Sequence, residues 1–179
     1  MLREDHIAWI MPRCPGDKRG EYIEHLTSTM RWAGITTVLR SAMYLGQLAH
    51  ESNEFRHFEE LSNGQAYEGR ANLGNTQPGD GPRYKGRGPI QITGRWNYQA
   101  ASDAIGIDLI STPEIAAQPA VGFKIAAWYW SSRNLNDKAD TFDFMAVTRA
   151  INGGLNGIDQ RLAYYKRALE VLARDAVIV

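Results

Sequence analysis

Ala49-His50-Glu51-Ser52 stands at the junction between a helical and a non-helical part of the chain, and this junction decides the predicted fold. The residues before it, from Val38 to about Ser52, repeat apolar side chains with the 3.6-residue period of a helix, and Thr36 or Thr37 can cap its start. The residues after it, 53–89, hold seven glycines and three prolines with little periodicity. A compact domain seldom carries so long an irregular segment unless the segment has a function.

The rest of the chain also shows mainly helical patterns. Apolar side chains in the last predicted helix recur at spacings of four, three, four and three, which places them on one face. No repeat, low-complexity run or linker interrupts the 179 residues, so we expect one mainly helical domain with a long irregular central segment. The other predicted helices are Glu21–Ala33, Gly94–Ile105, one that starts at Thr112-Pro113-Glu114, Pro119–Trp130, one from Thr141 that stops at Asn152-Gly153-Gly154, and Ile158–Arg174.

Composition excludes several classes of protein. Basic and acidic residues both number 20, so no overall charge favours nucleic acid or an anionic membrane. The single cysteine, Cys14, rules out an internal disulfide, and we interpret it as a structural thiol. The first residues carry charges where a signal peptide needs an apolar core, and the apolar run Ile7 to Met11 is too short to span a membrane. We expect a cytoplasmic protein that needs no cofactor or metal.

Two carboxylates, Glu51 and Glu60, carry the predicted chemistry. In an unbroken helix nine residues rise about 13.5 Å and turn about 900°, which would place the two side chains on opposite sides. The helix must therefore end near Ser52-Asn53 and the chain must fold back. An acid and a base roughly 6.5 to 9.5 Å apart leave room for a water and cleave a glycosidic bond with inversion. Glu51, near apolar neighbours, suits the acid, because burial keeps a carboxyl protonated.

Other acidic residues compete for the role of the base. Glu68 is the second candidate, and its alternative task is to hold the loop by an ion pair, with Arg70 or another residue. Glu59 is adjacent to Glu60, and Glu54 is too close to Glu51 in sequence to leave room for a water. A zinc protease is excluded, because its motif needs a histidine where this chain has Glu54.

The aromatic residues allow two interpretations. Tyr67, Tyr84, Trp96 and Tyr98 could present flat faces to sugar rings, and core packing is an equally good explanation for each. Trp128, Tyr129 and Trp130 lie in an apolar helix, where we expect core packing. Gly86 and Gly88 could let the backbone approach a sugar or simply form a tight turn.

Five ordered blocks closely resemble glycoside hydrolase family 19, which contains chitinases and bacteriophage endolysins. The resemblance runs from about Leu45 to Leu169 and implies a lysozyme-like, two-lobed fold around a cleft with an inverting mechanism. The blocks are His50-Glu51-Ser52 with Glu60, Lys85 to Tyr98, Val121-Gly122-Phe123-Lys124, Ala150-Ile151-Asn152-Gly153-Gly154, and Arg161 to Arg167.

The resemblance implies roles for the matching residues. Glu51 would be the general acid and Glu60 the general base, with Thr93 holding the water. Gln91 and Asn97 would bond sugar groups, and His50 would support the acid or bind sugar. Lys124, Asn152 and Arg161 would contact saccharide or tune the carboxylates. The remaining expected substrate-binding residues are Glu68, Arg70, Trp96 and Tyr98.

Departures from the plant chitinases favour bacterial peptidoglycan as the substrate. Plant enzymes are rich in cysteine, and an acidic residue often follows their Asn-Gly-Gly block where this chain has Asn156. Residues 67–81 are similar to the bacterial and phage version. We expect a monomeric endolysin without a separate cell-wall-binding module, which needs a holin-type pore protein to reach the wall from the host cytoplasm. The alternatives are a chitinase acting on N-acetylglucosamine oligomers, an inactive saccharide-binding domain, and a helical adaptor.

Overall fold

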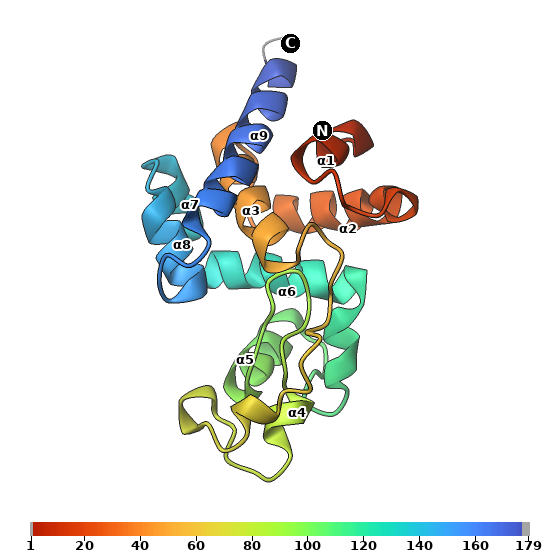
Figure 1. Ribbon diagram of the computed structural model, residues 1–179, viewed down its shortest axis with the longest axis vertical. Helices are drawn as coiled ribbons and strands as arrows, with labels where there is room; N and C mark the ends of the chain where they lie inside the picture. Colours follow the sequence, from red (N-terminus) through yellow and green to blue (C-terminus); the bar gives the residue numbers. More distant parts are fainter. Residues whose placement is uncertain (1, 177–179) are drawn as a thin grey trace.

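A computed structural model describes residues 2–176, which fold almost entirely into helices joined by loops (Figure 1). Thr37 caps α3 by accepting a hydrogen bond from the Arg40 backbone N–H at 3.2 Å. The α-helices are α1 (Glu4–Ile10), α2 (Arg19–Trp32), α3 (Val38–Glu51), α4 (Asp80–Arg83), α5 (Arg95–Ile105), α6 (Pro119–Ser132), α7 (Leu135–Asp140), α8 (Phe144–Asn152) and α9 (Ile158–Ala176), and the 3-10 turns are η1 (Gly16–Lys18), η2 (Gln65–Tyr67), η3 (Ala71–Leu73) and η4 (Pro113–Ala117).

Some of the predicted helix ends agree with the structure. Pro119 occupies the first turn of α6, and Gly153 ends α8 in the left-handed conformation with φ 76°. Two predictions were wrong. The cap of α8 is Asp143 rather than Thr141, and the start signal at Thr112 produces only the short turn η4. The short helices α1 and α7 were not predicted.

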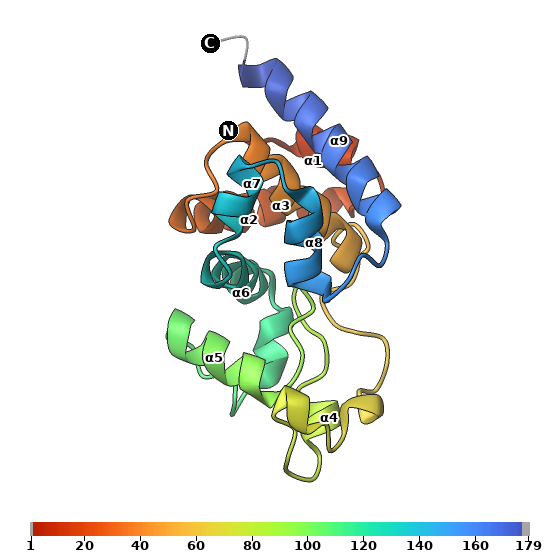
Figure 2. The same cartoon turned by 90° about the vertical axis from the view of Figure 1, so that its left-hand side faces the viewer.

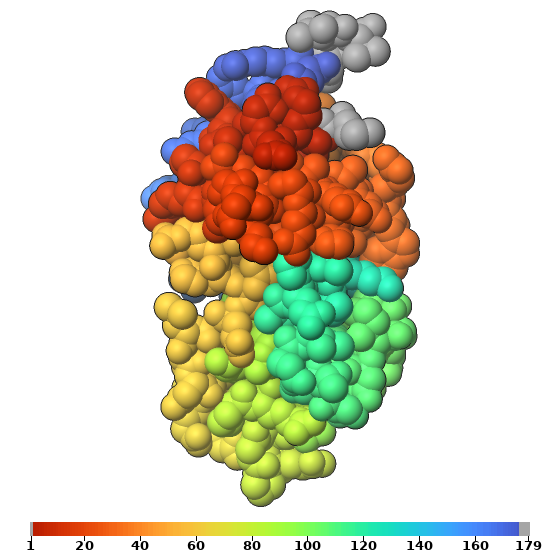
Figure 3. Space-filling model, turned by 90° about the vertical axis from the view of Figure 1, so that its right-hand side faces the viewer, coloured from red at the N-terminus to blue at the C-terminus, as the bar shows by residue number. Residues whose placement is uncertain are grey.

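The helices form two lobes with α6 between them. Helices α1, α2, α3, α7, α8 and α9 make the upper lobe, in which α3 packs along α9 (Figures 1 and 2). The lower lobe contains α4, α5 and most of the irregular segment. Helix α6 packs against both α2 and α5, and Figure 3 shows its residues, in blue-green, filling the waist of the molecule. The predicted mainly helical, two-lobed fold is confirmed.

The chain reverses directly after Glu51, as the two-carboxylate hypothesis requires. Asn53, Glu54 and Phe55 all adopt positive φ, between 50° and 64°, which is costly for residues other than glycine. Ser52 supports the reversal: its hydroxyl donates to the Leu48 carbonyl at 2.7 Å and accepts from the Phe55 N–H at 2.8 Å. Phe55 is fully buried, and its ring meets three other aromatic rings, those of Tyr22, Phe58 and Phe123.

Polar side chains order the irregular segment where regular hydrogen bonding is missing. Asp80 is 1% exposed and binds Arg95 and the Gln77 N–H. Buried Asn75 donates to the Tyr67 carbonyl and accepts from the Arg95 N–H. Between residues 2 and 176 the extended backbone makes only the isolated bridges of Arg87 with Glu59 and with Ile92. In this segment, side chains therefore satisfy backbone groups that neighbouring strands would satisfy in a sheet.

Within the described part of the chain, no helix combines the length and the apolar character needed to cross a membrane.

Candidate active site

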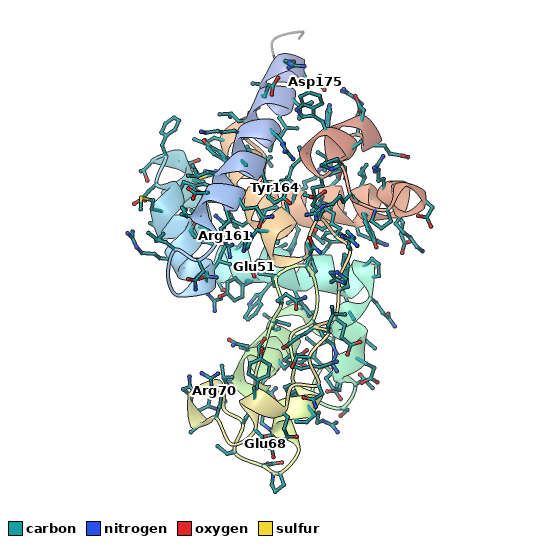
Figure 4. All side chains as sticks on the ribbon, viewed as in Figure 1. Glu51, Glu68, Arg70, Arg161, Tyr164 and Asp175 are labelled. Carbon is teal, nitrogen blue, oxygen red and sulfur yellow. The ribbon has the colours of Figure 1, made fainter. Side chains whose placement is uncertain are left out.

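Glu51 is the last residue of α3, and a buried arginine holds its carboxylate (Figure 4). Arg161 of α9 donates from Nη2 to Glu51 Oε1 at 2.5 Å, from Nη1 to Gln47 Oε1 at 2.7 Å and from Nε to the Asn156 carbonyl at 3.0 Å. Gln47 in turn donates to Thr148 Oγ1 at 2.8 Å. The network fixes Glu51 from its Oε1 side and leaves Oε2 without a hydrogen-bond partner among residues 2–176.

Arg161 cannot touch a saccharide in this structure, because its side chain is 0% exposed. The expectation that it contacts substrate is therefore corrected, and the alternative that it acts on a carboxylate agrees with the geometry. Burying an arginine is costly unless its charge is paired and its donors are bonded, and Glu51 with the neighbouring oxygens meets both conditions. The Glu51 side chain, at 17% exposed, remains reachable from outside.

Glu60 is held by a different kind of contact. Its Oε1 accepts from the Tyr67 hydroxyl at 3.0 Å, and its Oε2 accepts from the Gly86 N–H at 2.9 Å. The Glu60 N–H donates back to the Gly86 carbonyl at 2.9 Å, and Lys85 Nζ donates to the Glu60 carbonyl at 3.1 Å. Burial raises the pKa of Tyr67, and its hydrogen bond to Glu60 adds to the rise. Tyr67 therefore stays a neutral donor to the carboxylate at neutral pH.

The rival acidic residues all have structural tasks. Glu68 accepts from the N–H groups of Gly79 and Gly81 at 2.7 and 2.8 Å, and Figure 4 places it at the lower tip, far from Glu51. Glu59 pairs with Arg87 and Lys85. Glu54 is 3% exposed and accepts from Arg13 and Tyr164. Burial alone would raise the Glu54 pKa, but these hydrogen bonds lower it. Glu60 remains the predicted base.

Gln91, Thr93 and Asn97 are linked to one another by hydrogen bonds, and Gln91 lies beside Glu60. A methyl group added to Gly86 would lie 2.9 Å from Gln91 Oε1 and 3.0 Å from Glu60 Oε2, so both side chains rest against this glycine. Gln91 donates to the Gly88 carbonyl at 2.8 Å, Thr93 to the Gln91 carbonyl at 3.0 Å, and Asn97 to the Thr93 carbonyl at 2.8 Å. The groups that approach Gly86 closely in this structure are thus the side chains of Gln91 and Glu60.

The two aromatic candidates of α5 differ sharply. Trp96 is 61% exposed and rests on Gly74, so its ring is available to a ligand. Tyr98 is 0% exposed, packs on Tyr84, and its hydroxyl donates to the Lys85 carbonyl at 2.7 Å and accepts from Arg87 at 3.1 Å. The expectation that Tyr98 binds substrate is wrong, because its ring belongs to the core of the lower lobe.

The remaining predicted residues lie in several places. Lys124 donates to the carbonyl of Ile105 at the end of α5, at 3.1 Å, a favourable place for a cation. Arg70 is exposed beside Glu68 at the lower tip (Figure 4). Asn152 ends α8, and its Oδ1 is buried without a partner among residues 2–176. Their contacts with substrate stay predictions.

His50 lies in the last turn of α3, and its ring contacts α9 and the loop before it. Its Nδ1 lies 2.7 Å from Gln160 Oε1, and its ring packs against Gly157. Burial lowers the pKa of His50, and the charge of Arg161 lowers it further. The imidazole is therefore neutral at pH 7 beside the predicted acid.

Gln47, Thr148 and Tyr67 were not predicted as partners of the carboxylates, although Tyr67 was named as a ring that could face a sugar. Gln47 precedes Glu51 by four residues, which places both on one face of α3, and this spacing was a usable signal. Thr148 and Tyr67 gave none, because only the fold brings them near the carboxylates. Cys14 is a buried free thiol, and burial raises its pKa to about 11, as suits a structural cysteine. Within residues 2–176 no three His, Cys, Asp or Glu side chains gather as metal ligands would.

Comparisons with known proteins match the chain to one family. A family model described as "Chitinase class I", from glycoside hydrolase family 19, matches residues 42–149. A "Glycosyl hydrolase family 19 domain-containing protein" of Haemophilus influenzae is 33% identical over 90% of this chain and 93% of its own length. An Arabidopsis thaliana endochitinase is 36% identical over 76% of this chain, and this chain spans about half of that relative, 47%.

Solved structures show the same fold. Chitinase C from Streptomyces griseus superimposes with a TM-score of 0.78 at 25% identity, covering 96% of this chain and 76% of that one. A class IV chitinase from Zea mays gives a TM-score of 0.70 at 26% identity, covering 95% and 90%.

Proposed function

The chain belongs to glycoside hydrolase family 19, and from this premise we propose that it hydrolyses the glycan strands of bacterial peptidoglycan with Glu51 as acid and Glu60 as base. The observation that carries the proposal is the pair of differently held carboxylates. Glu51 is oriented by buried Arg161 with Oε2 free, and Glu60 is oriented by Tyr67 and Gly86 beside Gln91. An inverting glycosidase needs one carboxyl group as acid and a second as base, with room for a water beside the scissile bond.

The proposed reaction uses only these side chains and a water. Glu51 gives a proton from Oε2, the oxygen that Arg161 does not hold, to the leaving glycosidic oxygen, and the carboxylate that forms is paired with Arg161. Glu60 removes a proton from a water that attacks the opposite face of the sugar. The Thr93 hydroxyl donates to the Gln91 carbonyl, so its oxygen can still accept a hydrogen bond from that water. Gln91 and Asn97 are proposed to bond the sugar, and exposed Trp96 offers a surface for its ring.

Chitin is the second candidate substrate, and it is supported by the chitinases among the relatives. Peptidoglycan is preferred because residues 67–81 resemble the bacterial and phage version and because Asn156 stands where plant enzymes often have an acidic residue. In keeping with that resemblance we propose a monomeric endolysin that acts during host lysis and reaches the wall from the cytoplasm through a holin-type pore.

A paired assay tests the proposal. Purified protein is added to outer-membrane-stripped bacterial cells and, separately, to N-acetylglucosamine oligomers, with Glu51→Gln as the inactive control. Clearing of the cells by the wild type and not by the variant supports peptidoglycan hydrolysis. Cleavage of the oligomers without clearing of the cells would show that the protein is a chitinase instead. If the protein acts on neither substrate, a saccharide-binding domain is favoured. Mass spectrometry of the new reducing ends identifies the linkage that is cut.

A further inference from the structure

Arg133, directly after α6, places its guanidinium over an aromatic ring and has no counter-charge within residues 2–176. Its guanidinium carbon lies 3.3 Å from the centre of the Tyr129 ring. Its only hydrogen bonds within residues 2–176 run from Nη1, to Ser132 Oγ at 3.1 Å and to the Tyr129 carbonyl at 3.5 Å. No carboxylate in the described chain lies within ion-pair distance of Arg133, whereas Arg40, Arg95 and Arg161 are each paired with one. Nε and Nη2 therefore donate to no acceptor among residues 2–176, and the Tyr129 ring restrains the guanidinium that carries them.

A chain of contacts connects this stack to the proposed acid. The Tyr129 hydroxyl lies 3.4 Å from the carbonyls of both Ala150 and Ile151, at the end of α8. Figure 2 shows this end of α8 beside α6 and above the lower lobe.

The loop that follows α8 completes the connection. Asn156 of this loop accepts a hydrogen bond from Arg161, which holds Glu51, and Gly157 packs on His50. Burial raises the pKa of Tyr129, and the negative charge of Glu51 contributes to the rise, which agrees with this proximity. The stack therefore lies on the acid side of the site.

A guanidinium with a free donor edge is suited to a carboxylate, which it binds with two parallel hydrogen bonds. Stacking on tyrosine restrains the side chain in advance, so less rotational freedom is lost on binding. Chitin carries no carboxylate. Peptidoglycan carries them on its peptides, and also on the lactyl group of its muramic acid once the peptide is removed.

We propose that Arg133, stacked on Tyr129, binds a carboxylate of the substrate beside Glu51 and so favours peptidoglycan over chitin. This inference rests on the proposed function. It assigns a specificity role to a residue at the end of α6. The family resemblance had assigned a role to only one residue of that helix, Lys124.

Three substrates separate the sources of the carboxylate. Intact sacculi carry peptide carboxylates, glycan strands stripped with an amidase carry lactyl carboxylates, and N-acetylglucosamine hexamers carry neither. Initial rates are measured on each for the wild type, Arg133→Gln and Arg133→Lys. The matched control is Arg167→Gln, because Arg167 is an exposed arginine on α9 that also lies over a tyrosine ring, at 5.8 Å from Tyr164. Thermal unfolding confirms that each variant is folded.

We expect Arg133→Gln to raise KM roughly tenfold on at least one carboxylated substrate, the scale of one charge-assisted hydrogen bond. Its rate on the hexamer should match the wild type, and Arg133→Lys should recover part of the loss. The substrate that responds identifies the carboxylate. Equal losses on all three substrates would show that Arg133 only supports the fold, and unchanged rates on all three would also overturn the inference. A wild type that cuts only the hexamer would overturn the proposed function itself, and the inference with it.

Discussion

The two predicted catalytic carboxylates are supported in opposite ways. Glu51 ends a helix and is held by Arg161, which lies 110 residues away in sequence and is completely buried. Glu60 lies in an irregular segment. It accepts hydrogen bonds from the hydroxyl of Tyr67 and from the backbone N–H of Gly86. The orientation of the acid therefore depends on the packing of α3 on α9, and that of the base on the shape of one loop. The difference predicts that changes around Glu51 affect folding, while changes around Glu60 affect mainly the rate.

The largest expected effect separates the chemistry of Glu51 from the packing around it. Glu51→Gln should lower turnover by roughly two to four decades, the usual contribution of a general acid, and it should also lower the melting temperature, because it leaves the buried charge of Arg161 without a partner. Glu54→Gln is the matched control: it weakens buried hydrogen bonds to Arg13 and Tyr164, so it should lower stability and keep the activity of the folded enzyme. Kinetics and thermal unfolding measure both. Wild-type activity in Glu51→Gln would remove Glu51 from the mechanism.

The second prediction tests whether the residues that hold Glu51 contribute to the stability of the fold. Arg161→Gln removes one partner of a buried pair, and we expect a loss of about 3 kcal/mol or more in the free energy of unfolding. Arg174→Gln on the same helix breaks an exposed pair with Glu170 and should cost less than about 0.5 kcal/mol. Urea titrations compare the two. Similar small losses in both variants would mean that Arg161 contributes no more than a surface arginine.

A smaller effect is expected on the base side. Tyr67→Phe removes one hydrogen bond to Glu60, and we expect a loss in kcat of about three- to tenfold with the stability almost unchanged. Tyr165→Phe is the control, because the Tyr165 hydroxyl makes no hydrogen bond within residues 2–176. If Tyr67→Phe lowers the stability as much as the activity, the proposed contrast between the two sides fails.

The smallest effect concerns pH. The pKa of His50 is lowered in the folded protein, so the unfolded chain takes up the proton first as the pH falls. His50 therefore reduces stability below its ordinary pKa of about 6.5 and has no such effect above it. His50→Gln should lose less stability than the wild type between pH 7.5 and pH 5.5, as measured by urea unfolding at both values. A constant difference between the two proteins across this range would show that His50 does not titrate in this way.

Much of the upper lobe could be predicted because caps and periodicity are local signals. Thr37 and Gly153 defined helix ends, and the reversal after Glu51 followed from the requirement that two carboxylates share a substrate. Helices α1 and α7 escaped prediction because seven and six residues are too few to show a period.

Arg161 and Tyr98 each had two possible roles. The family resemblance let Arg161 contact saccharide or tune a carboxylate, and Tyr98 could present its ring to a sugar or pack in the core. Both side chains are fully buried and satisfy their polar groups inside the protein, which favours the second role in each case. Burial of an arginine or a tyrosine depends on partners that are distant in sequence, such as Gln47 for Arg161 and Lys85 for Tyr98. A single sequence shows which side chain is present but not which partner it meets. The polar character of Arg161 and Tyr98 could therefore be predicted, and the direction in which each side chain points could not.

Gly88 and Gly122 meet where the loop that follows Glu60 packs on α6. A methyl group on Gly88 would lie 3.3 Å from the Gly122 α-carbon and 3.2 Å from the Ala116 carbonyl, and one on Gly122 would lie 3.0 Å from Pro89. Gly79, at the exposed tip, has open space around it. In a library of engineered variants, residues 88 and 122 should therefore tolerate almost no exchange, because a side chain at either would push the loop away from α6. At residue 79 a side chain would meet no atom, and the positive φ of 88° is what opposes it.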